Sequence, residues 1–293
     1  MTRLGVIIPS VLCFCAIAQQ HPAPPADFKW VNALPKNAHP RVKHATYFSK
    51  IHNTAIGYAI YLPPGYETGT TRYPVIYYLH GGRPGGENKS VAMAAHFDSF
   101  IAKGEARPMI YVFSNGGAVS HYDYPAYKSF GQKTFTDELI PHIDKTYRTI
   151  ADWRARGVEG FSQGGRGSAR IGFDHPELFC SAAPFGGGHQ YERHAYEHGG
   201  LEGPPSGYIF AKGFNTYDLA ARKGRKPKLM IAVGTLDQNY EPNLHWMTHL
   251  DSLGIKYEKI IVPDVKHDAR GVYNVVGARS MKFHAACFAA EGR

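Results

Sequence analysis

The stretch GVEGFSQGGRGSARIGF, residues 157–173, is the part of the chain that most clearly predicts its fold. Residues 160–164 have the pattern G-x-S-x-G, after the apolar Val158 and before a segment with the apolar spacing of a helix. A serine at a sharp strand-to-helix turn needs glycine two positions to either side, because larger side chains would collide there. The stretch therefore predicts a strand, a strained turn that exposes Ser162, and a helix.

Outward from this turn, apolar runs of strand length alternate with amphipathic runs of helix length. This alternation is typical of α/β proteins with a mostly parallel, twisted sheet and helices on both faces. The expected strands are 47–49, 56–62, 75–79, 109–113, 157–160, 180–184, 229–233 and 257–262, and the expected helices are 91–103, 134–146, 164–175, 243–253 and 278–289.

Two segments do not follow the alternation. Residues 19–40 are rich in Pro and Ala and are expected to form a weakly ordered linker or arm before a single catalytic domain over 41–293. Residues 186–224 are rich in Gly, His, Tyr and Pro and are too long for an ordinary connection. They are predicted to be an insertion over the active site, with a lid and a structural packing insert as open alternatives.

The first residues have the pattern of an export signal. Arg3 precedes an apolar run over 4–17, and Ala16-Ile17-Ala18 matches a cleavage site. We expect a signal peptide over 1–18, a secreted or periplasmic protein, and no stable membrane insertion after cleavage. An uncleaved membrane anchor is the alternative, and it is disfavoured because the apolar run is shorter than a spanning helix. Cleavage would leave Cys180 and Cys287, and the sequence leaves open whether they pair.

The net charge of +9 and its distribution along the chain limit which classes of partner are expected. Its basic residues are dispersed along the chain, whereas a nucleic-acid footprint requires a cluster. A nucleic-acid partner is therefore not expected, and the positive charge is interpreted as serving general solubility, with attraction to anionic surfaces or polyanionic substrates as the alternative.

A serine hydroxyl becomes a nucleophile only when an imidazole accepts its proton and a carboxylate orients the imidazole. After a G-x-S-x-G turn these groups follow in the order acid, then histidine. Asp237 comes after the strand expected over 229–233, and His267 after that over 257–262, so both are expected at the same edge of the sheet as Ser162. The alternatives are Glu241 and Asp264 for the acid, and His245, His249 and His284 for the base.

Acyl transfer also needs two backbone N–H donors for the developing oxyanion. Gly82 follows the strand expected over 75–79 and is expected to supply one amide. Gln163, directly after Ser162 at a helix N-terminus, is expected to supply the other.

The ordered motifs of the chain resemble those of the esterase D-like family of α/β-hydrolases, which includes feruloyl and acetylxylan esterases, siderophore esterases and mycolyltransferases. The matching segments are 61–66 (YLPPGY), 78–82 (YLHGG), 138–144 (ELIPHID), 160–165 (GFSQGG), 234–237 (GTLD) and 262–268 (VPDVKHD). Many relatives carry Gly-Gly before the histidine where this chain has residues 264–266, so the geometry of that loop is not given by the resemblance.

The resemblance implies an α/β-hydrolase fold, a triad of Ser162, Asp237 and His267, an oxyanion hole of Gly82 and Gln163, and no cofactor. It also implies a small-molecule or polysaccharide-linked ester as substrate, with feruloyl or acetyl groups on plant polysaccharide preferred. Siderophore-ester hydrolysis and acyl transfer of the mycolyltransferase type are the alternatives.

Further candidates for substrate contact are His80, Tyr124 and His189. Tyr124 follows the strand expected over 109–113, where an aromatic ring could stack on a sugar or a phenolic group, although ordinary packing is equally compatible. The histidines and glutamates of 189–198 lack the H-E-x-x-H pattern, so no metal site is expected. Arg166 and Arg170 are expected to pair with carboxylates rather than with an acidic substrate.

Overall fold

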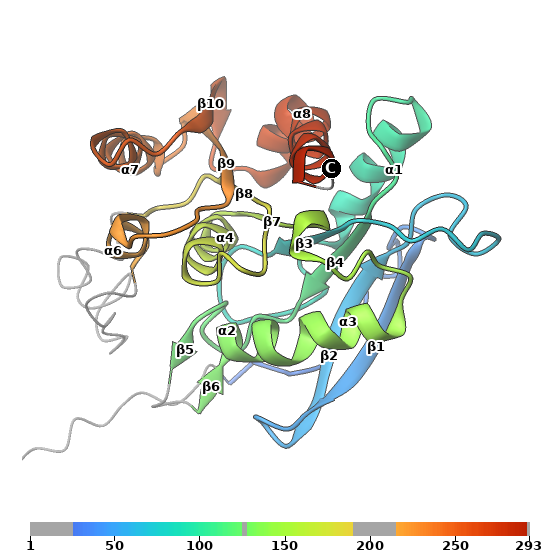
Figure 1. Cartoon of the computed structure of the whole chain (residues 1–293). Helices are drawn as coiled ribbons and strands as arrows, with labels where there is room; N and C mark the ends of the chain where they lie inside the picture. Colours follow the sequence, from blue (N-terminus) through green and yellow to red (C-terminus); the bar gives the residue numbers. More distant parts are fainter. Residues whose placement is uncertain (1–25, 125–127, 190–214, 292–293) are drawn as a thin grey trace, which may run out of the picture.

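The computed structural model describes residues 26–124, 128–189 and 215–291; the expected signal peptide and residues 190–214 of the expected insertion lie outside this range. An eight-stranded sheet has the order β1-β2-β4-β3-β7-β8-β9-β10 (Figure 1). The pairs β1–β2 and β2–β4 are antiparallel, and all other neighbours are parallel. The strands are β1 Val42–Ser49, β2 Thr54–Tyr61, β3 Val75–Leu79, β4 Ile110–Ser114, β7 Arg156–Phe161, β8 Ser181–Phe185, β9 Lys228–Leu236 and β10 Tyr257–Lys266, while β5 Asp123–Tyr124 and β6 Ser129–Phe130 form a separate ribbon.

Helices cover both faces of the sheet. Strand β3 shows why, because alternate side chains point to opposite faces: Tyr77 belongs to one apolar core and Tyr78 to the other. The first core lies beneath a π turn Phe135–Leu139, α3 Ile140–Thr146, α4 Gln163–Asp174, α6 Thr216–Ala221 and α7 Tyr240–Ser252, and the short α2 Gly131–Thr134 directly precedes the π turn. The second lies beneath α1 Ala94–Ala102 and α8 Ala269–Glu291 (Figure 1).

The expected fold class is therefore confirmed: the sheet is mostly parallel and covered on both faces. All eight expected strands and all five expected helices are present; β3 has the expected ends, and the others have shifted ends. The largest shifts are at the starts of α8 and β1, but the shifts that matter for the site are at the ends of β9 and β10, which run directly up to Asp237 and His267. The ends of these strands were predicted too early because residues 234–236 and 263–266 carry few apolar side chains.

The expectation of weak order before residue 41 is wrong for the part of the arm that the structure describes. The backbone carbonyl oxygen of Trp30 accepts a hydrogen bond from the backbone N–H of Gly57 at 2.7 Å. The centroids of the Trp30 and His52 rings are 4.2 Å apart. Pro and Ala composition predicts an extended arm, but it does not show what the arm packs against.

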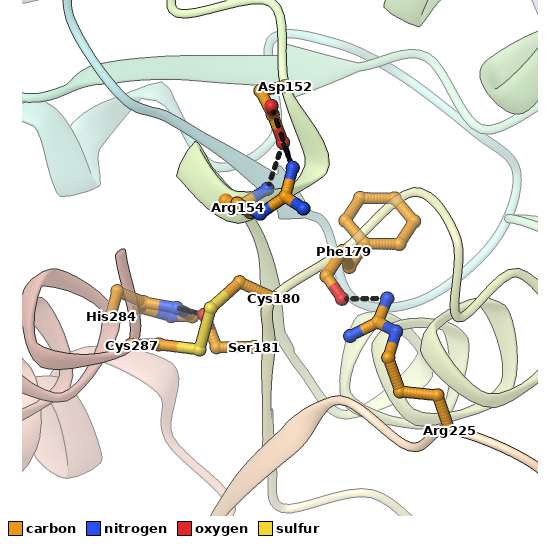
Figure 2. The surroundings of a disulfide bond; sticks show 8 residues. All are labelled: Asp152, Arg154, Phe179, Cys180, Ser181, Arg225, His284 and Cys287. Carbon is orange, nitrogen blue, oxygen red and sulfur yellow. Dashed lines mark hydrogen bonds and ion pairs between the residues drawn. A yellow bond between two sulfur atoms is a disulfide. The ribbon is translucent and has the colours of Figure 1, made fainter. Parts of the chain in front are cut away.

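The question left open by the cysteines is answered by a disulfide between Cys180 and Cys287, which are 107 residues apart in sequence. Cys180 directly precedes β8, and Cys287 lies in α8, so the bond joins the sheet to the helix that covers it. Figure 2 shows Ser181 and His284 beside the bond, with Ser181 Oγ and His284 Nδ1 2.7 Å apart.

Over the described ranges, none of the helices combines the length and the hydropathy that crossing a membrane requires.

Candidate active site

The predicted turn at Ser162 is present between β7 and α4. Ser162 has φ 59° and ψ −118°, a left-handed conformation that costs a non-glycine residue free energy and is typical of functional positions. The backbone N–H of Ser162 donates to the carbonyl oxygen of Phe185 at 2.8 Å, which ties the turn to the end of β8. The serine is therefore held in a strained conformation by the sheet beneath it.

The glycines around Ser162 are required by close backbone contacts. A Cβ atom on Gly164 would lie 1.9 Å from the carbonyl oxygen of Leu79, and one on Gly165 would lie 2.4 Å from that of Phe185. Helix α4 therefore begins in direct contact with the backbones of β3 and β8. Any side chain at these two positions would push the turn away from the sheet.

Ser162, His267 and Asp237 form a continuous chain of hydrogen bonds. The Oγ atom of Ser162 lies 2.8 Å from Nε2 of His267, and Nδ1 of His267 lies 2.8 Å from Oδ1 of Asp237. The Asp237 side chain is fully buried, whereas that of His267 is 26% exposed. The backbone N–H of Asn239 also donates to Asp237 Oδ1, at 2.7 Å. The carboxylate is thus fixed, and the imidazole is positioned to accept the serine proton.

An irregularity in β10 positions His267. Pairing of β10 with β9 shifts register between Val262 and Lys266, and Asp264 within the shift has φ 57°. Asp tolerates this left-handed conformation better than most non-glycine residues. Gly234 accommodates the irregularity, since a Cβ there would lie 2.1 Å from the carbonyl oxygen of Val265.

The alternative bases lie elsewhere. His284 is fully buried next to Ser181, His245 contacts the hydroxyl of Tyr217, and His249 contacts the Tyr217 carbonyl oxygen. Of the alternative acids, Asp264 is exposed in the β10 irregularity, and Glu241 lies in the first turn of α7.

The loop after β3 lies against the nucleophile. A Cβ on Gly81 would lie 3.3 Å from Ser162 Cβ, and the next residue, Gly82, has φ 67°. On the other side of the serine, Gln163 is the first residue of α4, where backbone N–H groups have no partner within the helix. Both expected oxyanion donors are thus carried by segments that adjoin Ser162.

A second loop, between β4 and β5, supports the loop after β3. Ser120 Oγ donates to the carbonyl oxygen of Gly82 at 2.6 Å, and His121 Nε2 lies 3.0 Å from the carbonyl oxygen of His80. His80 Nε2 in turn lies 2.8 Å from the carbonyl oxygen of Asn115. Burial lowers the pKa of His80 to about 4 and also lowers the pKa of His121, so both rings are neutral near pH 7.

The candidates for substrate contact have different surroundings. His80 was expected at the substrate, but its ring is buried beneath the loop and contacts backbone carbonyl oxygens. The buried ring of His189 stacks on Trp246 with ring centroids 3.8 Å apart, and burial lowers its pKa. Tyr124 is half-buried in β5, opposite Ser129, and its contact with substrate stays a prediction.

Arg166 and Arg170 are both buried and donate hydrogen bonds within the protein. Arg166 Nη2 donates to Gln163 Oε1 at 2.6 Å, and Arg170 donates to the Gln132 side chain and to the His121 carbonyl oxygen. Within the part of the chain that the structure describes, no group of His, Cys, Asp and Glu residues has the arrangement of a metal site.

Sequence reasoning missed Glu87, Asn115, Ser120 and His121. The one signal that pointed toward Glu87 is its position in the glycine-rich loop that carries Gly82, directly after Gly85 and Gly86. Asn115 directly follows β4, which is also the strand end at which functional groups gather.

Fold and geometry together define an α/β hydrolase with a Ser-His-Asp arrangement at the carboxyl ends of its strands. The match to known families is consistent with this class: residues 49–249 match the family described as "Putative esterase". The chain belongs to this esterase family.

Individual relatives agree with this membership. An endo-1,4-beta-xylanase/feruloyl esterase of Xylanibacter ruminicola is 31% identical over 157 residues, and an esterase of Mycobacterium tuberculosis is 28% identical over 149 residues. Each match covers 48% of this chain, and 21% and 32% of the respective relatives' own lengths. A solved ferulic acid esterase superposes with a TM-score of 0.70 at 22% identity, covering 84% of this chain and 98% of that structure, which shows the shared fold.

Proposed function

We propose that the protein is a serine carboxylic-ester hydrolase that works through an acyl-enzyme on Ser162. The observation that carries this proposal is the chain of two 2.8 Å hydrogen bonds from Ser162 through His267 to the buried Asp237. Few other roles require a strained serine, an imidazole and a carboxylate in this order.

In the first half-reaction, Ser162 Oγ attacks the ester carbonyl carbon while its proton passes to His267 Nε2. Asp237 accepts a hydrogen bond from Nδ1–H and stabilises the imidazolium that forms. The backbone N–H groups of Gly82 and Gln163 donate to the oxyanion. The C–O bond of the ester then breaks, and the alcohol leaves with the proton from His267.

In the second half-reaction, a water molecule gives a proton to His267 and attacks the acyl-enzyme. The same donors stabilise the second oxyanion, and the carboxylic acid leaves as Ser162 regains its proton. Water enters as a reactant and ester hydrolysis is the net change.

As substrate we propose an extracellular ester, with feruloyl or acetyl groups on plant polysaccharide preferred. The relative named as an endo-1,4-beta-xylanase/feruloyl esterase supports this choice. Location outside the reducing cytosol is part of the same proposal. It is supported by the disulfide between Cys180 and Cys287, since such bonds persist in oxidising compartments.

The test is turnover of p-nitrophenyl acetate by the purified protein, beside Ser162→Ala and a matched control, Ser168→Ala. Ser168 is a buried serine on the same helix whose hydroxyl donates to the Gly165 carbonyl oxygen at 2.9 Å. Wild type and Ser168→Ala should turn over, and Ser162→Ala should lose on the order of 10⁴–10⁶ in kcat. No turnover by wild type, or wild-type rates in Ser162→Ala, would contradict the proposal.

Methyl ferulate and acetylated xylan then test the choice of substrate. A higher kcat/KM for methyl ferulate would support an aromatic acyl group, and release of acetate from xylan alone would support an acetyl group. Activity on p-nitrophenyl acetate with neither would contradict the plant-polysaccharide proposal. Transfer of the acyl group to added alcohols faster than to water would make the protein an acyltransferase.

A further inference from the structure

The loop that carries Gly82 also carries a buried carboxylate, Glu87, which has no part in the proposed reaction. Glu87 lies between β3 and α1, five residues after Gly82, and its side chain is fully buried. An ionised carboxylate in such a place is costly unless hydrogen-bond donors surround it. The groups that contact the Glu87 carboxylate must therefore offset the cost of burying it.

Four donors from three other segments converge on the Glu87 carboxylate. Oε1 accepts from the backbone N–H of Asn32 at 2.6 Å and lies 3.0 Å from Nε2 of His44. Oε2 accepts from Nδ2 of Asn32 at 3.0 Å and from Nδ2 of Asn115 at 2.8 Å. The carboxylate thus joins the arm before β1, strand β1 and the loop after β4.

The backbone of β2 closes the site of this carboxylate on another side. A Cβ atom on Gly57 would lie 2.0 Å from Glu87 Oε1, so only glycine fits there. The backbone N–H of Gly57 donates to the carbonyl oxygen of Trp30, which also accepts from Asn115 Nδ2 at 3.1 Å. The arm segment 29–32 is therefore part of the structure that surrounds Glu87.

The contacts of Asn115 lead from Glu87 to the oxyanion loop. The side-chain amide of Asn115 donates to Glu87, and the backbone carbonyl oxygen of Asn115 lies 2.8 Å from Nε2 of His80. His80 directly precedes Gly81 and Gly82. In the same loop, the backbone N–H of Gly85 donates to the carbonyl oxygen of Gly117 at 2.8 Å. Each contact joins the loop after β3 to the loop after β4.

We propose that Glu87 is a positioning residue for the oxyanion hole. It fixes Asn115, and Asn115 fixes His80, so that the amide of Gly82 points toward the oxyanion; the arm segment 29–32 completes this support. The proposal rests on the esterase function proposed above. It gives the arm a role in catalysis, in addition to any role in stability.

The test is Glu87→Gln, which keeps the size of the side chain but turns one acceptor into a donor facing other donors. The readouts are kcat and KM for p-nitrophenyl acetate per titrated active site, and the inhibition constant of a trifluoromethyl ketone, whose adduct with serine carries an oxyanion. Loss of one oxyanion donor costs about 10²–10³ in kcat. A displaced donor should cost roughly 10–100-fold in kcat and a similar factor in the inhibition constant, with KM little changed.

Glu138→Gln is the matched control. The Glu138 carboxylate also accepts backbone N–H groups, from Lys50 at 2.8 Å and Ile51 at 3.1 Å, but it supports the turn between β1 and β2. Its kcat and inhibition constant should equal those of wild type, whatever its melting temperature.

Asn32→Ala keeps the proposal falsifiable if Glu87→Gln does not fold. It removes the side-chain donor of the half-buried Asn32, and it should lower kcat a few-fold with the same change in the inhibition constant. If the variants that fold have fewer active sites but wild-type kcat and inhibition constants, Glu87 serves stability alone and the proposal is overturned. If wild type itself does not turn over, the esterase proposal fails instead.

Discussion

Ser162 Oγ and His267 Nε2 lie 2.8 Å apart, although 105 residues separate them in sequence. Ser162 follows β7 and His267 follows β10, and Asp237, which contacts His267, follows β9. Because these strands are parallel members of one sheet, their carboxyl ends share an edge. The sheet thus assembles the site, and each partner can be tested where its strand ends.

We expect Asp237→Asn to lower kcat for p-nitrophenyl acetate by about 10⁴, because an amide favours the wrong tautomer of the imidazole. Asp264→Asn is the control, since Asp264 is exposed and its left-handed conformation suits Asn. Steady-state kinetics of both variants check this. Equal activity in the two would show that Asp237 does not orient His267.

We expect Gly164→Ala to cost about 3 kcal/mol or more in the free energy of unfolding and to abolish activity. The new methyl group would lie 1.9 Å from the Leu79 carbonyl oxygen, so the nucleophile turn would have to leave the sheet. Gly172→Ala, later in the same helix, would meet its nearest atom, Ala182 Cβ, at 3.1 Å and should change stability by about 1 kcal/mol or less. Urea denaturation of both proteins measures the difference, and a well-folded Gly164→Ala enzyme would contradict it.

We expect the free energy of unfolding to fall as the pH falls from 6.5 to about 4. Burial lowers the folded-state pKa of His80 from 6.5 to about 4, so in this window the unfolded chain binds more protons than the folded one. At about 1.4 kcal/mol per pKa unit, His80 alone accounts for about 3 kcal/mol. Burial lowers the pKa of His121 and His189 as well, which acts in the same direction.

Urea denaturation at pH 7 and pH 4.5, for wild type and His80→Asn, measures this pH dependence. The variant should lose less stability on acidification than wild type does, whatever its stability at pH 7. The same loss in both proteins would mean that His80 is not kept neutral by the fold.

We expect Cys180→Ala/Cys287→Ala to lower the free energy of unfolding by about 4 kcal/mol. The disulfide closes a loop with a sequence separation of 107, and loops of this length restrict the unfolded chain strongly. The double variant should unfold at the same urea concentration with and without dithiothreitol, whereas wild type should become less stable when reduced. A wild-type protein that the reductant does not destabilise would contradict the prediction.

Local pattern was sufficient to predict the sheet and the nucleophile turn. A central strand such as β3 (VIYYL) is a continuous apolar run because both faces of the sheet are covered, and the turn at Ser162 needs glycines that the sequence displays. The strand ends then directed attention to Asp237 and His267, whose contacts the structure shows.

Long-range polar contacts could not be predicted in this way. Glu87 is joined to Asn115 across 28 residues and to Asn32 across 55, and no periodicity records such pairs. His80 was a candidate for substrate contact, but histidine occurs both in active sites and in buried positions, and only its neighbours in the fold show that this ring is buried. Strand β10 continues past Val262 through Asp264, whose positive φ is uncommon for residues other than glycine. The sequence pattern therefore did not predict where this strand ends.

The disulfide also constrains when the protein can finish folding. At about 5–20 residues per second, a ribosome needs roughly 5–20 s to add the residues that separate Cys180 from Cys287. During this interval α8 is incomplete, so Cys180 has no Cys287 to pair with, and the apolar residues on the sheet face that α8 covers in the folded protein are not yet buried by it. A chaperone that holds this face, and an oxidant that acts only after α8 has docked, would therefore decide the yield of active protein.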